Sequence, residues 1–199
     1  MQSIESILGY WFGAASNDAD IIRDQSALWW KKNPHVDTEI RQRFEATLGA
    51  EFRDELESWG HDLRGQLARI LLCDQFPRNM YRDTAKSFAF DARARQLAHA
   101  TLDRGLDKRL RAVERVFIYL PFEHSETRQD QELSVQLFTS LLGEVTPALK
   151  PPFQNFLDFA HKHKAIIDRF GRFPHRNTIL GRESTPEELE FLKGSGSSF

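Results

Sequence analysis

Apolar residues recur at intervals of three or four along almost the whole chain, and this spacing constrains the fold more than any other feature of the sequence. In the longest such segment, one stripe carries Ile40, Phe44, Leu48, Phe52, Leu56 and Trp59. A repeat near 3.6 residues is typical of amphipathic helices, whereas strands alternate with a period of two. Candidate strands, such as VFIYL at 116–120, are too few to build a sheet. The pattern therefore predicts an all-α protein.

Capping residues and helix breakers divide the chain into about eight expected helices. The predicted boundaries include N-caps at Ser3, Asp37 and Thr84, helix stops at Pro77 and Pro121, and a C-terminal glycine at Gly105. The last helix should begin with a complete capping box at 185–188. Because the connections are short, neighbouring helices should be antiparallel, in a bundle or in a superhelix of helix pairs.

Length and composition indicate one helical domain at 1–193, followed by the low-complexity tail GSGSSF at 194–199, which is expected to be flexible. The net charge of −2 argues against a general nucleic-acid binder, because such proteins carry a basic excess. No apolar run approaches the roughly 18 residues of a membrane span. The single Cys73 excludes an internal disulfide and no secretory signal is evident, so a cytoplasmic protein is expected.

Three helices place ionisable residues on stripes that should be buried. Asp74 continues the apolar face of the helix that precedes it, and Asp130 and Glu126 lie in phase with the next turns of another. His163 shares an apolar face, whereas His161 should point to solvent. Burying an unpartnered polar group costs about 1–3 kcal/mol. Each inward residue should therefore meet a partner or a ligand.

These residues lie close to three prolines that interrupt helices, in FPRN at 76–79, PFEHSE at 121–126 and RFPHRN at 172–177. The simplest arrangement gathers the three breaks at one end of the bundle, where they line one polar cavity. The residues expected to bind a ligand there are Asp74, Arg78, Asn79, Arg82, Glu123, Asp130, Arg172, Arg176 and Asn177. Alternatively, arginine–carboxylate pairs and asparagine caps at these positions simply join helix ends.

The cavity is predicted to bind a small anionic metabolite, because the arginine fork matches carboxylate and phosphate groups. Histidine is the natural acid or base near neutral pH, and the catalytic candidates are His124, His163, His175 and Glu126. The alternative function is a helical-repeat interaction module that binds an acidic peptide or protein partner through Arg78 and Arg176. The sequence leaves open whether the protein is an enzyme.

Other site chemistries lack their sequence signatures. No HExxH motif is present, and HKH at 161–163 directs its two imidazoles to opposite faces of a helix, so no metal site is predicted. Ser125 follows His124 but has no GxSxG surroundings, and Cys73 lies in an apolar helix where a thiol is inert. No phosphate loop or dinucleotide fingerprint occurs, and no cofactor is predicted.

Long motifs resemble a known family over about residues 4–192. ILGYWFG at 7–13, LARILLCDQFPRNMYR at 67–82, FAFDARARQLA at 88–98, ERVFIYLPFEHSE at 114–126 and the segment HKHK to EELEFL at 161–192 are similar to the bacterial domain-of-unknown-function family 924. The resemblance implies an all-helical, tetratricopeptide-like domain and no established activity. It also implies signature positions at Asp74, Gln75, Arg78, Asn79, Arg82, Glu123, His124, Ser125, Glu126, His163, Arg172, His175, Arg176 and Asn177.

Overall fold

The computed structural model describes residues 1–194, 196 and 197, and these residues form helices without any strand. The α-helices are α1 (Ile4–Phe12), α2 (Asp18–Trp30), α3 (Pro34–Phe52), α4 (Leu63–Asp74), α5 (Phe76–Met80), α6 (Asp91–Asp103), α7 (Ala112–Glu123), α8 (Arg128–Glu144), α9 (Lys150–Phe170) and α10 (Pro186–Phe191). Short 3-10 helices lie between them: η1 (Glu57–His61), η2 (Ala85–Phe88), η3 (Asp107–Arg109), η4 (Pro147–Leu149) and η5 (Pro174–Arg176). The predicted all-α class is confirmed, and α2 and the short α5 add to the expected helices.

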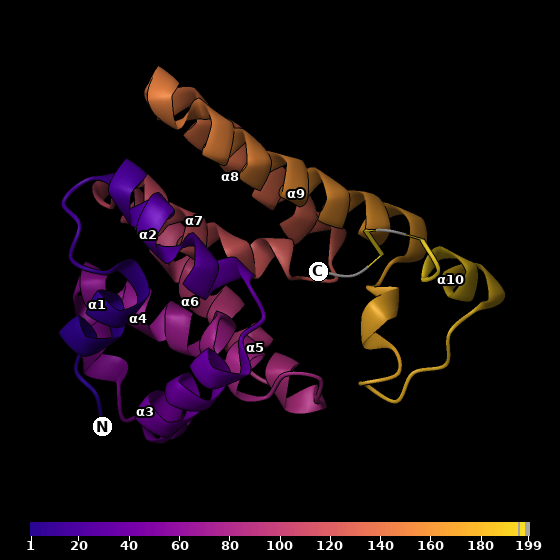
Figure 1. Cartoon of the computed structure of the whole chain (residues 1–199), viewed down its shortest axis with the longest axis horizontal. Coiled ribbons are helices and arrows are strands. Elements are labelled where there is room, and N and C mark those ends of the chain that lie inside the picture. Colours follow the sequence, from indigo (N-terminus) through magenta and orange to yellow (C-terminus); the bar gives the residue numbers. More distant parts are fainter. Residues whose placement is uncertain (195, 198–199) are drawn as a thin grey trace.

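Helices α4 and α7 form the centre of the molecule, and almost all of their residues are buried. Helices α1, α3 and α6 pack against α4, while α2, α8 and α9 pack against α7. Figure 1 shows α8 and α9 side by side along one edge, with the C-terminal segment leaving the far end of α9. The main hydrophobic core includes Trp11, Phe44, Phe76, Phe117 and Phe138. A smaller cluster, centred on Ile166, Ile167 and Phe173, anchors the C-terminal segment to α9.

Helix α7 passes through Pro121 and ends at Glu123, so the predicted stop at Pro121 is wrong. A proline removes one helical hydrogen bond, and here the loss falls in the last turn of the helix. The side-chain amide of Gln131 on α8 donates to the carbonyl oxygens of Glu123 at 2.6 Å and of Ser125 at 2.7 Å. A residue from the following helix therefore caps the end of α7, which no local pattern could indicate.

Helix α3 begins at Pro34, so the predicted N-cap at Asp37 is wrong. Asn33 caps the helix instead: its side chain accepts a hydrogen bond from the backbone N–H of His35, and Pro34 occupies the first helical position. Asp37 lies one turn further on and accepts two hydrogen bonds from Arg82, at 2.7 and 2.8 Å. The carboxylate that resembled a cap in the sequence thus joins α3 to the chain after α5.

Three other predicted boundaries are confirmed, and one is displaced. Ser3 caps α1, the capping box at 185–188 opens α10, and Gly105 follows α6 with a φ of 59°. The helix expected to open at Thr84 begins instead with η2, and α6 starts only at Asp91. Pro77 lies at the start of α5, directly after α4 ends.

The predicted tail at 194–199 lies partly outside the described residues, because 195, 198 and 199 are not among them. Within the described part, the Ser197 hydroxyl donates to the carbonyl oxygen of Leu192 at 3.2 Å. The domain limit at 193 stays a prediction. In the described ranges, no helix combines the length and apolar character needed to cross a membrane.

The packing of η1 on α4 yields a testable prediction at Gly65. A Cβ atom at Gly65 would lie 2.3 Å from the backbone carbonyl oxygen of Trp59, so Gly65→Ala should lower the free energy of unfolding by about 1–3 kcal/mol. The matched control is Gly9→Ala in α1, where a Cβ would meet nothing within 4 Å. That change should raise stability by about 0.5–1 kcal/mol. Urea denaturation at neutral pH measures both, and a neutral Gly65→Ala would contradict the packing.

Candidate functional site

The three proline-containing breaks meet at one end of the bundle. Arg78, in α5, and Arg176, in η5, approach the same carboxylate of Asp91, at 3.0 and 3.5 Å. Glu126, in the turn between α7 and α8, accepts a hydrogen bond from the backbone N–H of Phe173 at 2.8 Å. Segments separated by about a hundred residues in the sequence are therefore neighbours, as the polar pattern predicted.

A pocket of about 320 Å³ opens where these segments meet. Its walls come from η2, α6, the turn between α7 and α8, and the C-terminal segment after α9. The lining residues are Phe88, Asp91, Arg95, His124, Ser125, Glu126, Thr127, Arg176 and Leu180. Charged, hydroxyl and imidazole groups thus share a space large enough for a small metabolite.

Asp74 and His124 form a hydrogen-bonded pair beneath this pocket. Asp74 has no exposed surface, and its carboxylate lies 2.8 Å from Nδ1 of His124 and 2.5 Å from the side-chain amide of Gln75. Burial opposes ionisation of Asp74, but His124 and Arg78 outweigh it and lower its pKa to about 2. Burial, together with the charge of Arg78, lowers the pKa of His124. At neutral pH an ionised Asp74 therefore holds a neutral His124 by Nδ1–H, which leaves Nε2 as the basic nitrogen.

Glu123 and His163 make a second buried pair directly behind His124. Nδ1 of His163 lies 3.1 Å from a carboxyl oxygen of Glu123 and 2.9 Å from the carbonyl oxygen of Phe159. Burial, reinforced by the charge of Asp74, raises the pKa of Glu123 well above its usual value. Burial and the neighbouring His124 lower the pKa of His163 to about 3. Both directions favour the uncharged forms, so the pKa shifts argue against an ion pair at this contact.

The carboxylates around the pocket already have strong partners. Asp91 accepts two hydrogen bonds from Arg78, at 3.0 and 3.3 Å. Glu126 accepts two from Arg182, at 2.7 and 3.0 Å, which ties the C-terminal segment to the body of the protein. Asp130, just below the pocket, accepts a hydrogen bond from the Ser125 hydroxyl at 2.7 Å.

Two arginines of the pocket are bound much more loosely. Arg95 comes no closer than 3.6 Å to Asp130, and Arg176 no closer than 3.5 Å to Asp91. Among the described residues neither guanidinium has a directed hydrogen bond, and Nε of Arg176 is buried without a partner. Phe88 and Phe173 pack on Arg176, with its Cζ 4.6 and 4.5 Å from the ring centroids. Burial and the charge of Arg78 lower the pKa of Arg176 to about 10, which marks a cation short of compensating negative charge.

Comparison with known proteins places the chain in a family. Residues 7–196 match the family model described as bacterial protein of unknown function (DUF924). The chain belongs to this family. The solved structure of a protein of unknown function, ATU0120 from Agrobacterium tumefaciens, is 38% identical and has a TM-score of 0.76, covering 88% of this chain and 97% of that chain. No curated protein matches the chain.

The positions predicted as site residues in this DUF924 chain fall into three groups. His124, Glu126 and Arg176 line the pocket. Asp74, Arg78, Glu123, Asp130, His163 and His175 do not line it, and most of them lie directly behind its walls. Asn79 and Arg82 bind Asp37 on α3, while Arg172 and Asn177 bind Glu188 on α10. The last group makes the helix-joining contacts that were the alternative interpretation.

The sequence interpretation missed several pocket residues of the DUF924 domain. Asp91 and Arg95 lie one turn apart on α6, and Phe88 ends η2. A signal existed for Asp91, because it is in phase with the buried Ala94 and Ala98 and therefore points inward. Arg95 is in phase with Asp91 and Ala98 and so carries the same signal, but an arginine on a helix is ordinarily exposed and does not stand out in the sequence.

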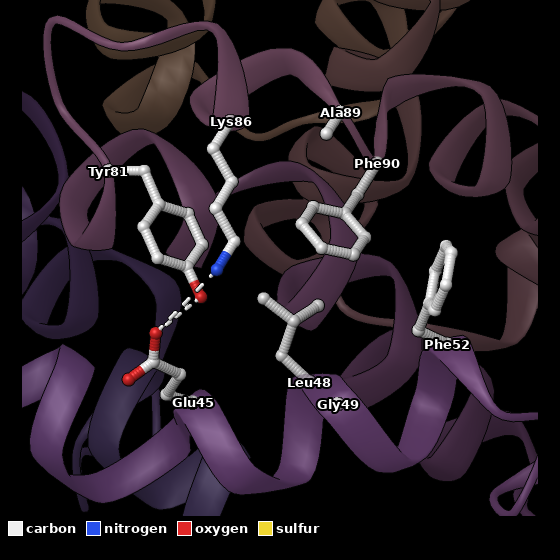
Figure 2. A pocket seen from close by; sticks show the side chains of 8 residues that line it. All are labelled: Glu45, Leu48, Gly49, Phe52, Tyr81, Lys86, Ala89 and Phe90. Atoms are coloured by element: carbon white, nitrogen blue, oxygen red, sulfur yellow. Dashed lines mark hydrogen bonds and ion pairs between the residues drawn. The ribbon is translucent and has the colours of Figure 1, made fainter.

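A second pocket, of about 400 Å³, lies between α3 and residues 81–90. Figure 2 shows Leu48 and Phe90 facing one another across it, with a polar end where Glu45 meets Tyr81 and Lys86. Its lining is mainly apolar, and it contains none of the predicted site residues. In the described part of the chain, no three His, Cys, Asp or Glu residues are grouped to hold a metal ion. The pocket around His124 is therefore the stronger candidate for chemistry.

Proposed function

We propose that the pocket around His124 binds a small ligand bearing carboxylate or phosphate, with Arg95 and Arg176 as its charge partners. The supporting observation is the contrast between the two kinds of charged group. Asp91 and Glu126 each accept two close hydrogen bonds from an arginine, whereas Arg95 and Arg176 stay 3.5 Å or more from any carboxylate. The two charged side chains that lack a close partner in this pocket are both cationic, so the pocket favours an anionic ligand.

His124 is the acid/base residue of this proposal. Its Nδ1 is engaged by Asp74 at 2.8 Å, so Nε2 is free to take a proton from a bound ligand or return it. Asp74 is the carboxylate that orients His124. Glu126, a catalytic candidate from the sequence, binds Arg182 with both of its carboxylate oxygens. His163 and His175 do not line the pocket, so the acid/base role rests on His124 alone.

The alternative, an interaction module for an acidic peptide, has less support. Of its two expected anchoring cations, Arg78 already makes two hydrogen bonds to Asp91 and one to the backbone oxygen of Asp74. Of these two arginines, Arg176 alone has a buried guanidinium N–H group without a hydrogen-bond acceptor in the described part of the chain. The pocket, at about 320 Å³, is also small, which suits a metabolite better than a peptide chain.

The proposal is tested by calorimetric titration with a panel of simple anions, including acetate, succinate and inorganic phosphate. At least one should bind, and Arg95→Ala or Arg176→Ala should weaken that binding by about 10- to 100-fold, because each removes a charge-assisted hydrogen bond. Arg104→Ala, which changes an exposed arginine just past α6, is the control and should leave affinity unchanged. Binding by none of the anions, or equal binding by all three variants, would contradict the proposal.

A further inference from the structure

The two open arginines lie on different walls of the pocket. Arg95 belongs to α6, whereas Arg176 enters from η5 in the C-terminal segment and contacts Asp91. Asp91 and Arg95 are four residues apart on α6, which corresponds to a rise of about 6 Å along the helix axis. Arg95 lies 3.6 Å from Asp130, whereas Arg176 lies 3.5 Å from Asp91, so the two open guanidinium groups stand beside different carboxylates. This arrangement suits a ligand that carries two separate anionic groups.

On this basis, and resting on the proposed function, we propose that the ligand is a short-chain diacid: one anionic group is bound by Arg95, the other by Arg176, and the carbon chain between them lies beside His124. The rim of the pocket suits such a linker, because the side chains of Phe88 and Leu180 are apolar. The hydroxyl groups of Ser125 and Thr127 lie on the wall nearest His124.

The charge balance of the site supports two separated groups over one multiply charged group. Four arginines lie in or behind the walls of the pocket, together with four acidic side chains. They are Arg78, Arg95, Arg176 and Arg182, and Asp74, Asp91, Glu126 and Asp130. A phosphate dianion placed on one arginine would bring two negative charges close to Asp91 or Asp130. Two separated monoanionic groups instead place one charge beside each open arginine, which limits like-charge repulsion.

The experiment is calorimetric titration with the diacids malonate, succinate, glutarate and adipate, and with the matched monoacids propionate and butyrate. The proposal predicts an optimum chain length, at which the diacid binds at least about tenfold more tightly than either monoacid. Arg95→Ala and Arg176→Ala should each reduce that diacid to the affinity of a monoacid. The double variant should bind neither kind of acid, and Arg104→Ala should change nothing.

The outcomes separate this proposal from the one on which it rests. If monoacids and diacids bind equally and both need Arg176, the pocket is an anion site and the diacid proposal is overturned. If inorganic phosphate binds at least as tightly as every diacid, the diacid proposal is likewise overturned while the anion site stands. If no anion binds, both proposals fail. Arg95→Ala keeps the test valid should Arg176→Ala not fold, because the Arg95 side chain is partly exposed.

Discussion

Asp74→Ala is expected to lower the free energy of unfolding by about 3 kcal/mol, because it leaves several buried donors without their acceptor. Asp74 is fully buried and accepts hydrogen bonds from His124 and Gln75, while Arg78 lies 3.6 Å away. Alanine would leave these donors buried and without their acceptor, and burial makes that loss expensive. Urea denaturation at neutral pH measures the effect.

The control for this change is Asp24→Ala, in an exposed pair with Arg23 at the surface of α2. That variant should stay within about 0.5 kcal/mol of the wild type, because exposed ion pairs contribute little. Asp74→Asn provides a second readout, because the amide can keep the shape of the site while removing its charge. The pKa of His124 should then fall further, since an attractive charge is lost. If Asp74→Ala lowers the free energy of unfolding by less than about 1 kcal/mol, the buried hydrogen-bonded pair of Asp74 and His124 is contradicted.

Glu123→Gln is expected to stabilise the protein increasingly as the pH rises. Burial and the charge of Asp74 raise the pKa of Glu123 well above 4.5. Above that pH the unfolded chain releases the proton while the folded chain keeps it, so wild-type stability falls as pH rises. The loss is up to about 1.4 kcal/mol per pH unit until the folded-state pKa is reached. Glutamine resembles the protonated carboxyl but has no proton to release.

Urea denaturation of both proteins between about pH 4 and pH 8 checks this sign, with no difference expected at the acidic end. Burial lowers the pKa of His175 to about 4, and this histidine destabilises both proteins alike in acid, so its contribution cancels in the comparison. Glu144→Gln is a control of opposite sign, because hydrogen bonds from Arg115 lower the pKa of Glu144 from 4.5 to about 2. This variant should be less stable than the wild type by a constant amount above about pH 5, and the difference should shrink only as the pH falls below 4.5. If the Glu123→Gln difference does not change with pH, Glu123 is ionised in the folded protein.

Helical periodicity was enough to predict the fold class and the inward direction of several polar residues. Asp74 is fully buried and His163 nearly so, while His161 is exposed, as their positions on the helix turn required. The direction of a side chain on one helix depends on local spacing, so the sequence is enough to predict it. The predictions at Pro121 and Asp37 were wrong because they depend on contacts between distant segments. A side chain from α8 caps the helix that contains Pro121, and Arg82, far away in the sequence, engages Asp37.

Partners within the candidate site could be predicted only in part. The sequence indicated that three polar breaks converge, but it could not assign each arginine to its carboxylate. Glu126 binds Arg182, which is 56 residues away, and Arg82 binds Asp37 at a separation of 45. Such pairings depend on how the helices pack, and chemically equivalent arginines compete for each acid. The loosely bound Arg95 and Arg176 become visible only once all other pairs are assigned.

The central claim is that Arg95 and Arg176 keep donors open for an anion. Its most direct test is a nuclear magnetic resonance titration with succinate that follows the Nε–Hε signals of individual arginines. We predict saturable shifts for Arg95 and Arg176, and none for Arg69 and Arg82, whose guanidinium groups are engaged by Glu51 and Asp37. Shifts confined to other arginines, or no shift at Arg95 and Arg176 under conditions where succinate binds, would contradict the account.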